Sequence, residues 1–256
     1  MMKKIVFCKC GGERINSERL QFIENNLRKF NVEICILSDL CFLSALNKDK
    51  LTEVFEAGKD YLVIGCYERS LKFLLHPINL DNINTSVKYI NVIELPDEEI
   101  VQEVSFFCKD SNQSLSVSEI GANHNWPSWF PVIDYSRCSA CGQCTDFCLF
   151  GVYEKSESGV NVVNPKECKN NCPACARICP QTAIIFPKYK SGGAIGGSDI
   201  IDEIAEQTRQ SLDIKYILEG DIYSALEQRK NKRRSIIRNE AMQKAMEERD
   251  DALNKS

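Results

Sequence analysis

Apolar residues in the first 108 positions alternate between short continuous runs and runs with helical spacing. The continuous runs are typical of strands buried on both faces, and the spaced runs are typical of amphipathic helices. The predicted strands cover residues 3–8, 32–37, 60–65 and 87–93. The predicted helices cover residues 17–30, 49–57, 69–76 and a segment that begins at Pro96. This alternation predicts an α/β domain at residues 1–108, with a parallel sheet and helices on both faces.

The pattern changes after residue 108. Residues 109–130 are rich in Ser, Asn, Gly and Pro, which predicts a linker that is flexible in its first half. Residues 131–187 carry short apolar runs between cysteine motifs, and the glycine-rich start of the segment 188–256 predicts a hinge. The rest of that segment, above all Asp221 to Leu253, is charged with a sparse apolar face, which predicts a solvated helical tail.

Composition narrows the class of protein. The chain has 256 residues, 43% hydrophobic and 27% charged, so it can bury a core and is long enough for two domains. Its net charge of −4 and its charge-balanced tail argue against a nucleic-acid partner. No apolar run is as long as a membrane span, and the apolar start at residues 5–7 is too short for a signal sequence. We therefore expect a cytoplasmic protein.

Eight of the fourteen cysteines form two runs with iron–sulfur spacing. Three thiolates spaced three residues apart can fold over one four-iron cube while the amides of their loop point at its sulfides. Zinc and disulfides also use cysteine pairs, but eight cysteines without a histidine in the pattern favour iron and sulfide. The runs comprise Cys138, Cys141, Cys144 and Cys148, followed by Cys168, Cys172, Cys175 and Cys179.

The flanks of the two runs repeat each other. Residues 132–138 are echoed thirty positions later by residues 162–168, and each half predicts a strand, a cysteine loop, a helical turn and a returning strand. Residues 131–187 therefore resemble bacterial-type two-cluster ferredoxins. The resemblance implies an α+β ferredoxin-like domain with two 4Fe-4S clusters, and a fourth ligand taken from the opposite run. It assigns Cys138, Cys141, Cys144 and Cys179 to cluster 1, and Cys168, Cys172, Cys175 and Cys148 to cluster 2.

Two departures from the ferredoxin pattern concern the loops. Leu149 follows Cys148 where the pattern has proline, and the second run has one extra residue among Lys169, Asn170 and Asn171. Neither departure removes a ligand. Both alter the amide donors around a cluster, and such donors influence its reduction potential. We therefore expect the two clusters to have different potentials.

Four more cysteines follow predicted strands of the first domain: Cys8, Cys10, Cys41 and Cys66. The carboxyl ends of parallel strands share one edge of a sheet, where functional crevices lie. Three interpretations remain open. The four thiols could hold a third iron–sulfur cluster approached closely by Gly11 and Gly12, act as a redox-active dithiol, or be partly buried free cysteines.

These positions carry a second resemblance. The segments Cys8 to Gly12, Asp39 to Cys41 and Val63 to Arg69 resemble the amino-terminal domain of the heterodisulfide reductase A-subunit family. That family consists of flavin and iron–sulfur electron-transfer subunits. The chain has no G-x-G-x-x-G after a strand and no room for a flavin domain, so no flavin is expected.

The remaining candidates have structural interpretations. Cys35 lies in an apolar strand and is expected in the core. His76 and His124 have no neighbouring residues of the kind that accompany a metal ligand or a general base, so both are expected to be structural. Cys108 has no predicted role. With no convincing acid, base or nucleophile, the sequence favours an electron-transfer subunit that relays electrons to a redox partner in a larger oxidoreductase complex. The alternatives are an oxidoreductase acting on a disulfide or sulfur substrate at the upstream cysteines, and an iron–sulfur cluster scaffold.

Overall fold

The computed structural model describes residues 2–10, 14–80, 85–109, 111, 113–121, 125–157 and 159–209. The segment Met1–Glu206 forms one compact unit. Within it we distinguish a sheet region, residues 2–121, from a cysteine region, residues 125–206. No helix among the described residues is both long and apolar enough to cross a membrane.

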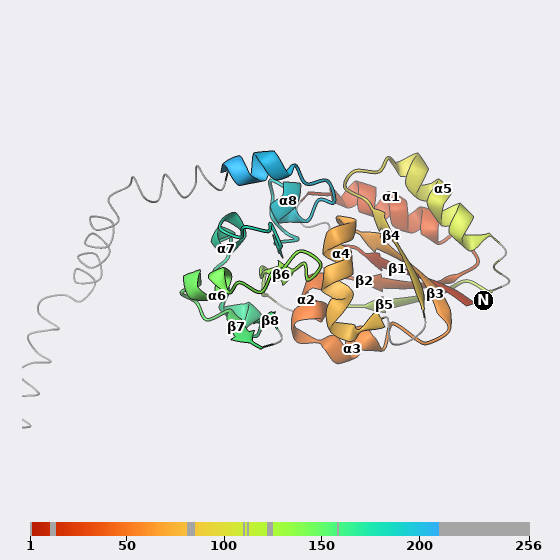
Figure 1. Ribbon diagram of the computed structural model, residues 1–256. Helices are drawn as coiled ribbons and strands as arrows, with labels where there is room; N and C mark the ends of the chain where they lie inside the picture. Colours follow the sequence, from red (N-terminus) through yellow and green to blue (C-terminus); the bar gives the residue numbers. More distant parts are fainter. Residues whose placement is uncertain are drawn as a thin grey trace, which may run out of the picture. The chain divides into compact units, whose positions relative to one another are not determined.

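The sheet region is built on five parallel strands in the order β4-β3-β1-β2-β5 (Figure 1). Its central strand is flanked on both sides, with Val6 paired with Cys35 on one neighbour and with Val63 on the other. This double pairing explains the continuous apolar run in the first strand, whose residues Ile5, Val6 and Phe7 are all buried. The strands are β1 (Met2–Cys8), β2 (Glu33–Leu37), β3 (Lys59–Gly65), β4 (Ser86–Asn91) and β5 (Ser116–Ile120).

Helices cover both faces of this sheet, as predicted (Figure 1). Ile5 and Phe7 pack in one apolar cluster with α1 (Ser17–Leu27) and α5 (Asp97–Cys108). Val6 and Cys8 point to the opposite face, which is covered by α2 (Leu40–Leu46), α3 (Lys48–Thr52) and α4 (Glu68–Leu75). A short 3-10 helix, η2 (His76–Ile78), follows α4. The alternation of side chains along β1 thus separates two cores.

Two details of the predicted sheet region were wrong. The predicted linker over residues 109–130 contains β5, which pairs in parallel with β2 and completes the sheet. Three of its five residues, Ser-Val-Ser-Glu-Ile, are polar and exposed because β5 is an edge strand, so composition concealed it. The helix predicted at residues 49–57 ends at Thr52, and the unpredicted α2 precedes it, begun by Asp39, whose carboxylate accepts a hydrogen bond from the Phe42 amide.

The cysteine region repeats one unit twice. In each half a strand leads into a cysteine loop, a short helix precedes the last cysteine, and a strand returns, as predicted. The first strand pairs with the last in antiparallel orientation, β6 (Val132–Ile133) with β9 (Ile184–Ile185), while β7 (Tyr153–Ser156) pairs with β8 (Gly159–Val162). The short helices are α6 (Gln143–Phe147), η4 (Pro165–Glu167), α7 (Ala174–Arg177) and α8 (Gly193–Gly196).

The glycine-rich segment that was predicted as a hinge is a packed element. Residues 194–198 are buried, and they lie against the start of α4, where the Ser70 hydroxyl donates to the Gly196 carbonyl at 3.1 Å. Gly197 has φ +97°, and a Cβ there would lie 1.9 Å from Ser70 Oγ. The glycines therefore allow close packing rather than flexibility. Residues 203–209 are helical, whereas the predicted tail helix, Gly11, Gly12 and His124 lie outside the described residues.

The two regions share an apolar core. Phe130, Val132 and Ile185 of the cysteine region belong to the same buried cluster as Val6 and Leu40 of the sheet region. Trp129 stacks on Phe186 at a centroid distance of 4.9 Å on the other side of β6. Burial of this kind is the main driving force of domain association, and it holds the sheet region and the cysteine region in one unit.

Candidate iron-sulfur centres

The first predicted ligand set converges on one pocket. Cys138, Cys141, Cys144 and Cys179 all line it, and apolar side chains of β6, β8 and β9 form its walls. Gly142, with φ +83°, turns the loop into α6 between the second and third cysteines. The Ala183 amide donates a hydrogen bond to Cys179 Sγ at 3.3 Å. The structure thus brings together three cysteines of the first run and the last cysteine of the second.

The second predicted set is also gathered. Cys168 lies within electrostatic reach of Cys172 and Cys148, and burial together with these two neighbours raises its pKa to about 12. Burial raises the pKa of Cys175 to about 12, although the Tyr153 hydroxyl, which donates to Cys175 Sγ at 3.0 Å, works in the opposite direction. Shifts of this size mean that the free thiols hold their protons, and metal binding would release them.

The two departures in the loops leave both sets intact. The backbone of Asn171 adopts the left-handed conformation at φ +58°, which asparagine tolerates better than most residues and which absorbs the extra residue. Leu149 is 82% exposed and lies outside the cysteine pocket. Among the described residues, no three Cys, His, Asp or Glu side chains are close enough together to hold a single ion. A four-iron cube is a larger group and keeps its thiolates further apart.

The four upstream cysteines also meet. Cys8 at the end of β1, Cys10, Cys41 in the first turn of α2 and Cys66 after β3 line one small pocket at the carboxyl edge of the sheet. Pro187 and Lys188, which follow β9, complete the lining together with Ile15. The four cysteines were predicted to meet because they follow strands of one parallel sheet, and they do. The sequence did not indicate that Pro187 and Lys188 of the cysteine region would close the pocket.

Two of the upstream cysteines are buried, and the pKa values of three are raised, so these three thiols hold their protons. Cys8 is 6% exposed and Cys41 is 2% exposed. A hydrogen bond with Cys10, followed by burial, raises the pKa of Cys8, and burial followed by the Asp39 charge raises the pKa of Cys41. Burial raises the pKa of Cys66 to about 12. In this state none of the three has the lowered pKa of an activated thiol.

Two cations face these four thiols. Lys188 Nζ lies 2.6 Å from Asp39 Oδ2 beside Cys41. Arg14 lies over the Tyr67 ring and donates through Nη2 to the Pro187 carbonyl at 2.8 Å, and its charge opposes the rise in the pKa of Cys66. The Nε and Nη1 atoms of Arg14 are buried without a hydrogen-bond partner among the described residues. Unsatisfied cationic donors beside four thiols fit a bound group with negative charge.

The other candidates have structural surroundings. Cys35 is buried in the core of the sheet, as predicted, and Cys108 packs at the edge of the opposite core, where burial raises its pKa to about 11. His76 stacks on Tyr135 at a centroid distance of 4.5 Å. These contacts account for the three side chains by packing.

A duplicated strand-loop-helix unit with two cysteine runs of iron–sulfur spacing is typical of ferredoxin-type iron–sulfur proteins. Comparison with known proteins agrees, since residues 130–210 match the 4Fe-4S dicluster domain family. The chain belongs to the ferredoxins that carry this domain.

Three relatives come from Methanocaldococcus jannaschii. One uncharacterized ferredoxin is 29% identical over 147 residues, which is 56% of this chain and 95% of that protein. Another is 34% identical over 61 residues, 23% of this chain and 79% of that protein. Pyruvate synthase subunit PorD is 32% identical over 59 residues, 23% of this chain and 67% of that protein. The predicted resemblance of the sheet region to the heterodisulfide reductase A-subunit family stays a prediction.

Proposed function

We propose that this ferredoxin is an electron-transfer subunit with three 4Fe-4S clusters. The observation that carries the proposal is that four cysteines and Lys188, from segments far apart in the chain, line one pocket beside the ferredoxin-type domain. Arg14 lies next to this pocket, because it binds the carbonyl of Pro187 and its charge acts on Cys66. A cluster held by four thiolates has a net negative charge, and Arg14, whose buried Nε and Nη1 have no partner among the described residues, supplies compensation that a buried anion requires. The charge of Lys188 is balanced by Asp39. Plain core cysteines would require no cation.

The chain's own residues divide into three ligand sets. Cluster 1 has Cys138, Cys141, Cys144 and Cys179, and cluster 2 has Cys168, Cys172, Cys175 and Cys148. The third set consists of Cys8, Cys10, Cys41 and Cys66. When bound, each cluster supplies a one-electron redox couple whose potential depends on nearby charges and hydrogen bonds.

Burial favours this function over chemistry on a disulfide or sulfur substrate. Attack on a disulfide needs an accessible thiol with a lowered pKa. Cys8 and Cys41 are buried, and the pKa of each is raised by its surroundings. The same burial disfavours a scaffold that passes its clusters on. Reduction of a polysulfide by viologen-reduced protein, or rapid transfer of its clusters to an apoprotein, would support one of these alternatives instead.

The partner that we propose is a redox protein in a larger oxidoreductase complex. The similarity to a subunit of pyruvate synthase supports a role of this kind. Anaerobic isolation of the tagged chain from its own cells tests the proposal. We expect a flavin, thiamine or iron–sulfur oxidoreductase at fixed stoichiometry, and recovery of the chain alone at physiological concentration would count against it.

Iron and sulfide analysis tests the number of clusters. We expect about twelve irons and about twelve acid-labile sulfides per chain after anaerobic purification, since each cluster contributes four of each. About eight of each would leave only the two clusters of the ferredoxin-type domain. Potentiometric EPR of the same protein should resolve different midpoints for clusters 1 and 2.

The Tyr153→Phe variant should lower the midpoint of cluster 2. The Tyr153 hydroxyl donates to Cys175 Sγ, and a donor to sulfur stabilises the more negative, reduced state. If that bond is stronger by about 1 kcal/mol in the reduced state, its loss lowers the midpoint by roughly 40 mV. Tyr135→Phe is the control, because the Tyr135 hydroxyl bonds to Asn161 instead. Equal shifts in the two variants would contradict the assignment.

A further inference from the structure

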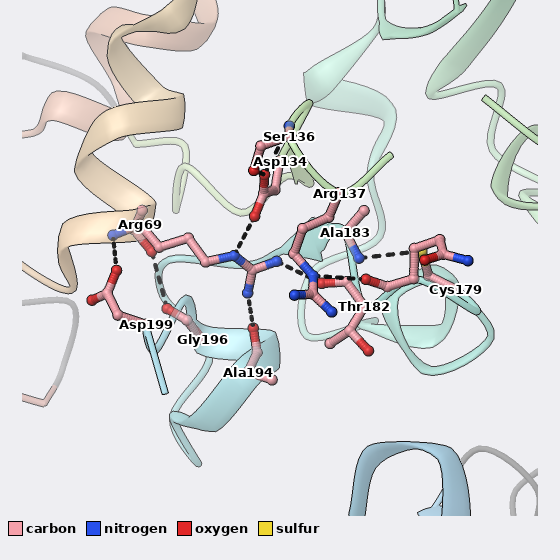
Figure 2. Close-up of polar contacts among 12 residues, drawn as sticks. Arg69, Asp134, Ser136, Arg137, Cys179, Thr182, Ala183, Ala194, Gly196 and Asp199 are labelled. Carbon is pink, nitrogen blue, oxygen red and sulfur yellow. Dashed lines mark hydrogen bonds and ion pairs between the residues drawn. The ribbon is translucent and has the colours of Figure 1, made fainter. Parts of the chain in front are cut away.

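Arg69, on α4 of the sheet region, reaches into the cysteine region (Figure 2). It is 6% exposed, and its partner Asp134 is 2% exposed. Arg69 Nε lies 2.5 Å from Asp134 Oδ2, Nη2 donates to the Thr182 carbonyl at 2.5 Å, and Nη1 donates to the Ala194 carbonyl at 3.1 Å. Every described contact of this guanidinium is therefore with a segment that follows the sheet region.

Two of these partners, Asp134 and Thr182, lie on the chain segments that carry the ligands of cluster 1. The main-chain carbonyl of Asp134 accepts a hydrogen bond from the Cys138 amide at 2.9 Å. The Thr182 carbonyl and the Ala183 amide belong to one peptide group, and that amide donates to Cys179 Sγ at 3.3 Å (Figure 2). Arg69 thus binds one end of a peptide group whose other end binds a ligand sulfur.

We infer that Arg69 sets the reduction potential of cluster 1 from the sheet region, an inference that rests on the proposed ligand set of that cluster. A cation on the carbonyl of a peptide group polarises it, so its N–H becomes a stronger donor to Cys179 Sγ. The positive charge also favours the more negative, reduced cluster directly, in a buried site where screening by solvent is weak. Asp134 opposes both effects.

The arrangement distinguishes the two clusters of the ferredoxin-type domain. Among the described contacts of Arg69, none is with the loop of Cys168, Cys172 and Cys175. Arg69 follows Cys66 by only three residues at the start of α4, so one short segment joins the upstream pocket to the surroundings of cluster 1. The docked sheet region therefore raises the potential of cluster 1 selectively.

Potentiometric EPR of charge variants tests the inference. Arg69→Gln should lower the midpoint of cluster 1, and Asp134→Asn should raise it, while that of cluster 2 stays unchanged in both. Arg69→Lys should give a smaller decrease, because it keeps the charge but lacks the planar fork. Cys138→Ser and Cys168→Ser variants identify which midpoint belongs to which cluster.

Arg137→Gln is the matched control. Arg137 Nε donates to the Gln181 carbonyl at 2.9 Å, and the amide of that same peptide group, at Thr182, donates to the Cys179 carbonyl rather than to its sulfur. Arg137 is also partly exposed. We expect little shift in this variant, and a shift as large as that of Arg69→Gln would assign the effect to net charge alone.

The measurements distinguish failure of this inference from failure of the proposed function. Iron analysis accompanies every variant, and a wild-type protein without a cluster at Cys138 refutes the function rather than the role of Arg69. The inference would be overturned if fully loaded Arg69→Gln and Asp134→Asn variants kept the wild-type midpoint of cluster 1. It would also be overturned if the midpoints of clusters 1 and 2 shifted together. If Arg69→Gln does not fold, Asp134→Asn tests the inference instead, because it keeps a hydrogen-bonding side chain of the same size. An unchanged midpoint of cluster 1 in that variant would then overturn the inference.

Discussion

The Cys41→Ala variant should lose about a third of the iron, from about twelve to about eight per chain. Cys41 lies in the first turn of α2 and is 2% exposed, so no solvent ligand can easily take its place in the upstream pocket. The EPR signals of clusters 1 and 2 should persist, because their cysteines form separate sets in the cysteine region.

Cys35→Ala is the control for this variant. Cys35 is also 2% exposed and lies on the neighbouring β2, but it does not line the upstream pocket. Both substitutions remove one buried sulfur, at a packing cost of about 1 kcal/mol each. Only Cys41→Ala should also lose the stabilisation that a bound cluster gives the sheet region. If Cys35→Ala and Cys41→Ala contain equal iron, the third ligand set is refuted whatever their stability.

The Gly197→Ala variant should be destabilised by about 3 kcal/mol. A Cβ at this position would lie 1.9 Å from Ser70 Oγ, and the backbone φ of +97° is unfavourable for alanine. Strain of the backbone and overpacking each contribute about 1–3 kcal/mol. Chemical unfolding of the loaded protein, followed by the loss of cluster absorbance, measures the shift in the unfolding midpoint.

Gly193→Ala separates the two contributions. Gly193 also has a positive φ, +61°, but a Cβ there meets nothing within 4 Å. Only the backbone contribution should remain, and the loss of stability should be clearly smaller. Adding Ser70→Ala to Gly197→Ala should recover part of the loss. Equal destabilisation at Gly193 and Gly197 would mean that close packing against α4 is unimportant.

Patterns within short segments were sufficient to predict much of this molecule. The continuous apolar runs of β1 to β4 and the cysteine spacing are local, and the upstream convergence follows from the strand ends that these runs predict. The exchange of the fourth ligand between the two cysteine runs came instead from the resemblance to two-cluster ferredoxins. The edge strand β5 was missed because three of its five residues are polar and exposed. The hinge predicted at residues 191–199 was wrong, because a glycine-rich sequence can serve either close packing or flexibility.

Contacts across long sequence separations could not be predicted. Arg69 and Asp134 are 65 positions apart, and Lys188 is 149 positions from Asp39. An arginine in an amphipathic helix and a lysine after a short strand are ordinary on sequence alone. Their roles come from the docking of the two regions, which depends on the shape of the shared core rather than on a motif.

The cover of the upstream pocket implies an order of assembly. Cys8, Cys10, Cys41 and Cys66 all leave the ribosome before any residue of the cysteine region, whereas Pro187 and Lys188 follow the last ferredoxin cysteine. Domains fold from the amino terminus during synthesis, so the strand ends that present these thiols can form while the pocket is still open. A group delivered to them early is enclosed when Lys188 reaches Asp39. The direction of translation thus gives the sheet region a period for loading that ends when Lys188 binds Asp39.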